Sequence, residues 1–196
     1  MQIEIFSDFA CPFCYIAKTR LYEAIDQLGL GNEVEITYKA YQLKPDASKE
    51  TSSKIELKPD VQEAIEKHAK EVGVTFNFDK LMTGNSENAH RLARWAATKG
   101  KGKLFFDTVM QRYFEDGLQL NDEAELLAVV RDLQLPVEEA RGVLQSDAYV
   151  EELAADRYDA QQLQVTRVPF FVFNNQYGII GVEPIEVFVK TLKQAK

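Results

Sequence analysis

Two cysteines, Cys11 and Cys14, are the only ones in the chain, and they lie where a predicted strand meets a predicted helix. Residues 2–7 alternate polar and apolar side chains, as a half-buried strand does. Pro12 suits the first turn of a helix, where its missing N–H has no partner to lose. Apolar residues then recur at roughly helical spacing over 15–28. The cysteine pair is therefore expected at a strand-to-helix junction.

The order of the flanking elements constrains the fold further. Residues 34–41 alternate again and predict a second strand, so strand, helix and strand imply a parallel pair with a right-handed crossover. Near the other end of the chain, 170–173 and 176–180 predict an antiparallel hairpin. Residues 184–192 predict a final amphipathic helix. The strands thus lie near both ends of the chain.

The stretch between these two groups of strands is predicted to be helical. Its apolar residues recur at three and four positions, so each helix has one face to bury. The sequence predicts an α/β fold, β-α-β then β-β-α, with a large all-helical insertion between the halves. In domain terms, 1–43 and 165–196 form one discontinuous unit, and 44–164 form the insertion. The predicted helices are 59–72, 86–99, 103–115, 122–133, 137–146 and 148–163.

The spacing of the cysteines fits thiol–disulfide exchange. A thiol attacks a disulfide as its thiolate, which the free N–H groups and partial positive charge of a helix N-terminus stabilise. Cys11 is placed to be the nucleophile, and Cys14, one turn later, can resolve the mixed disulfide. Pro12 and Phe13 carry no charge, and Asp8 would oppose the anion slightly. We expect a sulfur partly open to water, with a moderately lowered thiol pKa.

Two other interpretations of the cysteine pair are structural. Both side chains could be small core residues, or they could form half of a zinc site. The zinc site would need His68 and His90, which are distant in sequence, and the chain has no second cysteine pair. The position of the pair at a strand-to-helix junction favours redox chemistry over both alternatives.

Composition excludes several classes of function. The chain has 31 acidic and 23 basic residues, a formal net charge of -8, which disfavours nucleic acid as a partner. No apolar run approaches the roughly 20 residues that a membrane span needs, and the N-terminus lacks a signal-peptide pattern. We therefore expect a cytoplasmic protein with neither nucleic acid nor membrane as a partner.

Two separated motifs resemble one known family. Residues 7–15 read SDFACPFCY, and 168–173 read VPFFVF. Both are similar to the motifs of the DsbA-like thioredoxin-fold oxidoreductases, and specifically of their FrnE-like cytosolic branch. Residues 88–92 and the pair Tyr113-Phe114 also resemble that family's helical insertion, so the likeness spans nearly the whole chain.

The resemblance implies a thioredoxin-like fold, split after its second strand by the insertion. It implies that Pro169 is a cis-proline facing the cysteines, although most X-Pro bonds are trans. Val168 would then offer backbone groups to an extended substrate segment. The substrate-binding residues expected on this basis are Pro12, Phe13, Val168, Pro169 and His90.

One position departs from the family pattern. Thioredoxins and DsbA proteins commonly carry an acid six residues before the nucleophile, where this chain has Ile5. Glu4 is one residue off, and alternation along a strand should turn it to the opposite face. Solvent or another group would then carry the proton.

Other side chains have weaker claims to a role. Trp95, Tyr113 and Phe114 could line a substrate groove, but aromatic residues at helical spacing more often pack in a core. His68 is expected to be a solvated helix residue.

The leading hypothesis is a DsbA-like disulfide oxidoreductase that exchanges disulfides with protein or small-thiol substrates through Cys11 and Cys14. The dithiol itself is the redox centre, so no cofactor or metal is expected, and glutathione could serve as a thiol partner. One alternative is a glutathione-dependent isomerase or transferase of the same superfamily, whose members typically have serine in place of Cys11. The other is a non-enzymatic peptide-binding adaptor or chaperone. An apolar groove could also serve a homodimer.

Overall fold

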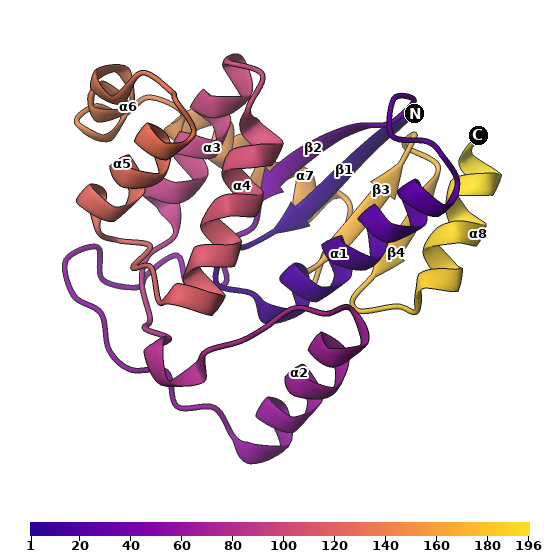
Figure 1. Cartoon of the computed structure of the whole chain (residues 1–196). Helices are drawn as coiled ribbons and strands as arrows, with labels where there is room; N and C mark the ends of the chain where they lie inside the picture. The colour runs from indigo at the N-terminus through magenta and orange to yellow at the C-terminus, as the bar shows by residue number, and fades with distance from the viewer.

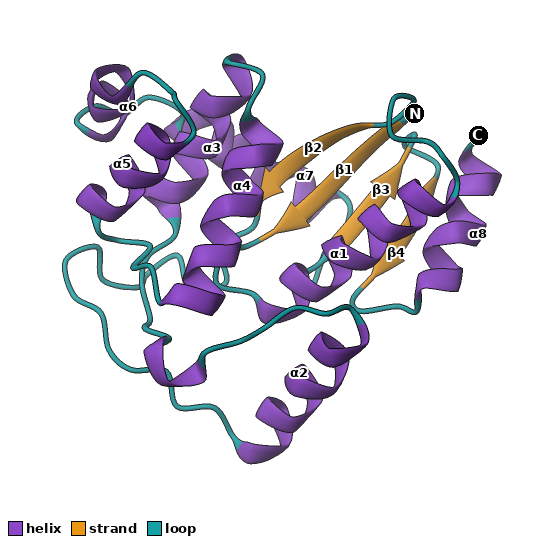
Figure 2. Ribbon diagram, viewed as in Figure 1, coloured by secondary structure: helices purple, strands orange, loops and turns teal.

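The computed structural model describes residues 1–196 and places a four-stranded mixed sheet among eight α-helices (Figures 1 and 2). The order across the sheet is β2-β1-β3-β4. β1 pairs parallel with β2 and antiparallel with β3, and β4 returns antiparallel along β3. The strands are β1 (Gln2–Ser7), β2 (Glu35–Ala40), β3 (Phe170–Phe173) and β4 (Tyr177–Ile180).

The helices confirm the predicted β-α-β then β-β-α order. α1 connects β1 to β2, six α-helices stand between β2 and β3, and α8 follows β4. The fold is therefore thioredoxin-like, with the helical insertion in the predicted place. The α-helices are α1 (Pro12–Gln27), α2 (Pro59–Glu71), α3 (Glu87–Thr98), α4 (Gly102–Gln111), α5 (Glu123–Asp132), α6 (Val137–Leu144), α7 (Val150–Gln162) and α8 (Ile185–Ala195).

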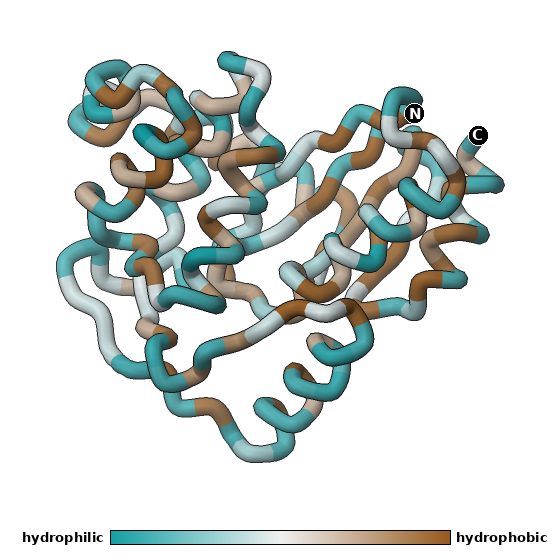
Figure 3. The backbone as a smooth tube through the Cα atoms, in the orientation of Figure 1, coloured by the Kyte–Doolittle hydropathy of each residue, from teal (hydrophilic) through white to brown (hydrophobic).

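Alternation along β1 divides the core between the two faces of the sheet. Ile3 and Ile5 are buried in a cluster with apolar side chains of α1, β3 and α8. Phe6 belongs to a larger cluster that includes Cys11, Cys14 and most of the buried residues of the insertion. The hydropathy view shows the apolar residues concentrated along the strands and the inner sides of the helices (Figure 3). Because one cluster spans the insertion and the strands, the division into two domains stays a prediction.

The predicted helix 103–115 changes its form in its last four residues. α4 begins at Gly102, and at Arg112 the backbone changes to a π-helical turn, η2 (Arg112–Asp116). The wider turn lets the consecutive Tyr113 and Phe114 both be buried, each only 1% exposed. Gly117, with a φ of +84°, ends the turn in the left-handed region.

The insertion is not helical throughout. After β2 the chain runs through an irregular segment to α2, and Lys54 forms an isolated antiparallel bridge with Met82. A short 3₁₀ helix, η1 (Phe78–Lys80), precedes that bridge. At the other end of the chain, α8 continues to Ala195 rather than ending at 192, because Ala195 packs in the cluster beside α1.

Candidate functional site

The strand-to-helix junction places the two cysteines as predicted. Cys11 is the N-cap of α1 in an extended backbone conformation, and Pro12 opens the helix. The backbone N–H of Cys14 donates to Cys11 Sγ at 3.2 Å. This is a helix N-terminal amide directed at the sulfur, the contact that stabilises a thiolate. Both thiols are free.

The sulfurs are more buried than the sequence suggested. Cys11 is 3% exposed and Cys14 1%. Burial is the main reason that the pKa of Cys11 is raised well above its usual value, and the neighbouring Cys14 thiol and the Asp8 carboxylate raise it further. The Cys14 amide acts in the opposite direction but does not outweigh burial. The predicted lowering of this pKa, and the expected partial opening to water, are therefore wrong for this conformation.

The second motif lies against the first. The Val168–Pro169 peptide bond is cis, as the resemblance implied. The Cys11 thiol points to the Val168 carbonyl oxygen, with an S···O distance of 3.9 Å. Two segments 157 positions apart in sequence thus form one site.

A cavity of about 670 Å³ opens beside this site, and we call it the Cys11 groove. Of the predicted substrate-binding residues, Pro12, Phe13 and Val168 line it, whereas Pro169 and His90 do not. Two arginines in its wall, Arg157 and Arg167, were not predicted. Arg167 immediately precedes the Val168-Pro169 pair, which is a local signal, but nothing in the sequence near Arg157 indicates its position. The other lining residues are Cys11, Ala40, Tyr41, Gln42, Leu43, Pro45, Leu57, Val61, Ile65, Leu153, Ala160, Gln161, Val165 and Thr166.

His90 lies behind the cysteine loop rather than on the Cys11 groove. Its side chain is 3% exposed, and its Nε2 is 3.3 Å from Asp8 Oδ1. The His90 ring also packs against the ring of Phe9, with the two ring centroids 4.8 Å apart. The expected place of His90 among the substrate-binding residues is thus wrong, because a buried carboxylate three residues before Cys11 holds the imidazole inside.

Asp8 is the centre of a buried polar cluster next to Cys11. It is 1% exposed, and its Oδ2 accepts the Leu43 N–H at 2.7 Å. Burial raises the pKa of Asp8. The hydrogen bond and the charge of His90 act in the opposite direction, and so do the hydrogen bonds from Leu43 and Ser86. Together they leave the pKa of Asp8 below its usual value. Asp8 thus links the cysteine loop to α3.

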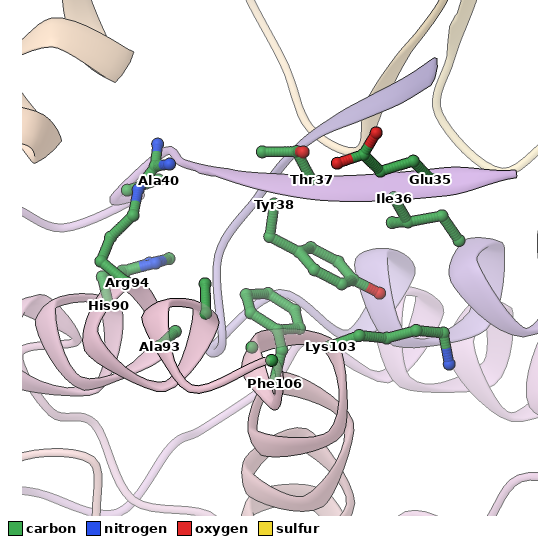
Figure 4. A pocket seen from close by; sticks show the side chains of 13 residues that line it. Glu35, Ile36, Thr37, Tyr38, Ala40, His90, Ala93, Arg94, Lys103 and Phe106 are labelled. Carbon is green, nitrogen blue, oxygen red and sulfur yellow. The ribbon is translucent and has the colours of Figure 1, made fainter. Parts of the chain in front are cut away.

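His90 also lines a second cavity, of about 320 Å³, between β2 and helices α3 and α4 (Figure 4). Tyr38 projects into it from β2 and stacks on Phe106 with ring centroids 3.7 Å apart. The Tyr38 hydroxyl is 2.6 Å from that of Tyr22, which donates in turn to Asp107. This hydroxyl pair was not predicted, because tyrosines in a strand and a helix look like ordinary core residues in the sequence.

The remaining predicted residues have structural surroundings. Ile5 is buried beneath α1, and Glu4, on the opposite face, is 3.6 Å from Lys39. Glu4 is thus turned to the face opposite Ile5, as the alternation predicted, and its exclusion from proton transfer stays a prediction. Trp95 is a core residue. His68 is not simply solvated, because its Nδ1 is 3.1 Å from the Arg20 guanidinium.

The aromatic pair Tyr113 and Phe114 is buried, yet it also lines an apolar cavity of about 180 Å³ behind Pro12. The Tyr113 hydroxyl donates to the Met82 carbonyl oxygen at 2.9 Å. No group of three or more histidine, cysteine or acidic side chains is arranged to hold a metal ion. No helix has the length and apolar character that a membrane crossing requires.

Comparison with known proteins gives the family. The sequence model of a DSBA-like thioredoxin domain matches residues 2–193. A probable DsbA oxidoreductase of Streptomyces coelicolor, SCO1869, is 30% identical with a TM-score of 0.91, over 100% of this chain and 89% of that one.

Two more distant structures share the fold. The cytosolic disulfide reductase DsbM of Pseudomonas aeruginosa, solved with GSH, is 14% identical with a TM-score of 0.71, over 99% and 98% of the two chains. A 2-hydroxychromene-2-carboxylate isomerase is 18% identical with a TM-score of 0.76, over 99% and 95%. From the match over nearly its whole length, the chain belongs to the DsbA-like thioredoxin domain family.

Proposed function

We propose that the chain is a thiol–disulfide oxidoreductase that works through Cys11 and Cys14. The observation that carries this proposal is the geometry of Cys11 Sγ, which accepts the Cys14 N–H at 3.2 Å and lies 3.9 Å from the Val168 carbonyl oxygen. The sulfur therefore meets both a helix N-terminus and the cis-proline segment.

The reaction follows from these positions. The Cys11 thiolate attacks one sulfur of a substrate disulfide, which forms a mixed disulfide and releases the other half as a thiolate. Cys14 then loses its proton and attacks Cys11 Sγ, which releases the second thiolate and leaves a Cys11–Cys14 disulfide. Two electrons pass from the dithiol to the substrate, and the reverse sequence oxidises a dithiol.

The groove residues take complementary roles in this proposal. The Val168 backbone pairs with the segment that carries the disulfide, as strands pair. Pro12 and Phe13 form the apolar wall next to the attacking sulfur. Because His90 lies behind the loop, it acts on Cys11 only through Asp8.

The setting proposed is that of the FrnE-like branch in the cytoplasm, with glutathione or a protein thiol as redox partner. The likeness to DsbM, a cytosolic disulfide reductase solved with GSH, supports this setting.

Reduction of insulin tests the proposed function. Cys11→Ser should abolish the activity, because the nucleophile is lost. Cys14→Ser should keep the first step and accumulate a mixed disulfide with substrate, visible by intact mass. Retention of insulin reduction in Cys11→Ser would contradict the proposal.

A redox titration of the Cys11–Cys14 pair separates the proposed enzyme from the two alternatives. A potential within the cytosolic range of roughly −220 to −320 mV is expected of a working couple. The likeness to the isomerase is the observation that favours the second candidate. That enzyme class would keep its activity in Cys11→Ser, since serine is typical at this position. An adaptor would bind clients equally well without either cysteine.

A further inference from the structure

The wall of the Cys11 groove is positively charged. Arg157 and Arg167 line it, and no aspartate or glutamate is among its lining residues. The chain as a whole carries a net charge of -8. An acid-free wall with two arginines is thus opposite in sign to the protein around it.

Both arginines are available to a ligand. Each is exposed, and neither forms an ion pair within the chain. The guanidinium of Arg157 has a single neutral partner, the Gln42 side-chain oxygen, at 3.3 Å. By contrast, the charge of the buried Lys18 is paired within the chain, with its Nζ 2.9 Å from Asp107 Oδ1. The charge of the groove is therefore not neutralised by the protein itself.

The size and lining of the groove suit a small molecule. Its volume of about 670 Å³ falls in the range of small-ligand sites, roughly 300–1,000 Å³. Its walls come from the cysteine loop, the segment after β2, α2, α7 and the segment before β3. Apolar side chains such as Phe13, Val61 and Leu153 make up much of the lining. An apolar body with an anionic group matches this combination.

We propose that the Cys11 groove selects small disulfides that carry a carboxylate on each thiol half, and that Arg157 and Arg167 determine this specificity. The inference rests on the proposed function. In the reaction, the Cys11–Cys14 dithiol supplies two electrons and becomes a disulfide. The S–S bond of the substrate breaks, and its two halves leave as thiolates, while the two thiol protons pass to solvent or to the products.

Two aromatic disulfide reagents that differ in charge test the selectivity. Dithiobis(nitrobenzoate) carries one carboxylate on each ring, whereas dithiodipyridine is neutral near pH 8. The second-order rate constant of each with the reduced full-length protein is measured by stopped flow. For the variant R157Q/R167Q, the rate constant with the carboxylate reagent should fall roughly tenfold, while that with the neutral reagent stays within about twofold. High salt should reduce the difference.

Arg131→Gln/Arg141→Gln is the matched control, because both are exposed arginines, of α5 and α6, outside the groove. It removes two positive charges, as R157Q/R167Q does, and should leave both rate constants unaltered. An equal fall of both rate constants in R157Q/R167Q would show that the arginines only shape the site. An unchanged rate constant with the carboxylate reagent would show that they do not select for its charge. Either result overturns the inference.

Insulin tests whether the two arginines act on small disulfides only or on protein substrates as well. The rate of insulin reduction should fall less in R157Q/R167Q than the rate constant with the carboxylate reagent does. A tenfold loss with insulin as well would overturn the restriction to small disulfides. A wild-type protein that reacts with neither reagent and does not reduce insulin would instead overturn the proposed function, so the two failures are distinguishable.

Discussion

Replacing His90 by leucine should leave the charge of Asp8 without its partner inside the protein. The two side chains are 3% and 2% exposed, and their closest N and O atoms are 3.3 Å apart. Breaking a buried pair by removing one member costs about 3–5 kcal/mol. Asp8 Oδ2 keeps the Leu43 N–H at 2.7 Å, so we expect the lower end, about 3 kcal/mol at pH 7. Leucine preserves the apolar packing against Phe9.

The pH dependence distinguishes a charge effect from a packing effect. In the unchanged protein the pKa of Asp8 is below its usual value, so its contribution to stability is present above the unfolded pKa, about 3.9, and is lost as the pH falls through the native pKa. Without His90, burial dominates and the native pKa of Asp8 rises above the unfolded value. Asp8 then favours folding at low pH and loses that contribution as the pH rises. The cost of His90→Leu should therefore be smaller near pH 4 than at pH 7.

Urea unfolding with excess dithiol reductant measures this cost at both pH values, with the fluorescence of the buried Trp95 as the probe. A loss of about 3 kcal/mol corresponds to a fall of roughly 6–12 °C in Tm for a chain of this size. In the double variant Asp8→Asn/His90→Leu no charge is buried, so part of the lost stability at pH 7 should return. Equal losses at the two pH values, with no recovery in the double variant, would refute the charge argument.

Four further changes test single features. Asp122→Ala removes an N-cap whose carboxylate accepts two backbone N–H groups of α5, and urea unfolding should show a loss of about 1 kcal/mol. Gly117→Ala should cost about 1–2 kcal/mol, because its φ is +84° and the added Cβ would lie 2.7 Å from η1. Gly142→Ala, in an open helical position, should instead stabilise by about 0.5–1 kcal/mol, and thermal melts compare the two. Asp8→Asn should lower the pKa of Cys11, so iodoacetamide alkylation of Cys11 should rise at lower pH.

The elements near the cysteines could be predicted because each depends on local chemistry. The alternation of polar and apolar residues over 2–7 predicted β1, and Pro12 predicted the first turn of α1. The same local signals predicted that Cys11 lies at the N-terminus of that helix, where the structure has it as the N-cap. The cis bond at Pro169 depended on the family resemblance instead, since no property of the dipeptide itself favours cis over trans.

The contacts of the buried polar groups could not be predicted in this way. His90 and Asp8 are 82 positions apart, and their pairing depends on how α3 packs behind the cysteine loop. The π-helical turn at Tyr113 is a similar case, because helical spacing alone cannot show that two adjacent aromatic rings will both be buried. Tertiary packing decided both features.

The raised pKa of Cys11 has the same origin, and it bears on how the site reacts. The helix N-terminus and the Asp8 carboxylate are fixed by the backbone around the cysteine, but burial depends on walls from α2, α7 and the Val168 segment. Burial is also the largest cause of the raised pKa. Water or a polar substrate admitted between these walls would therefore lower the pKa of Cys11 without any change at the helix terminus. The local sequence identifies the nucleophile, whereas the distant walls of the groove determine when it becomes a thiolate.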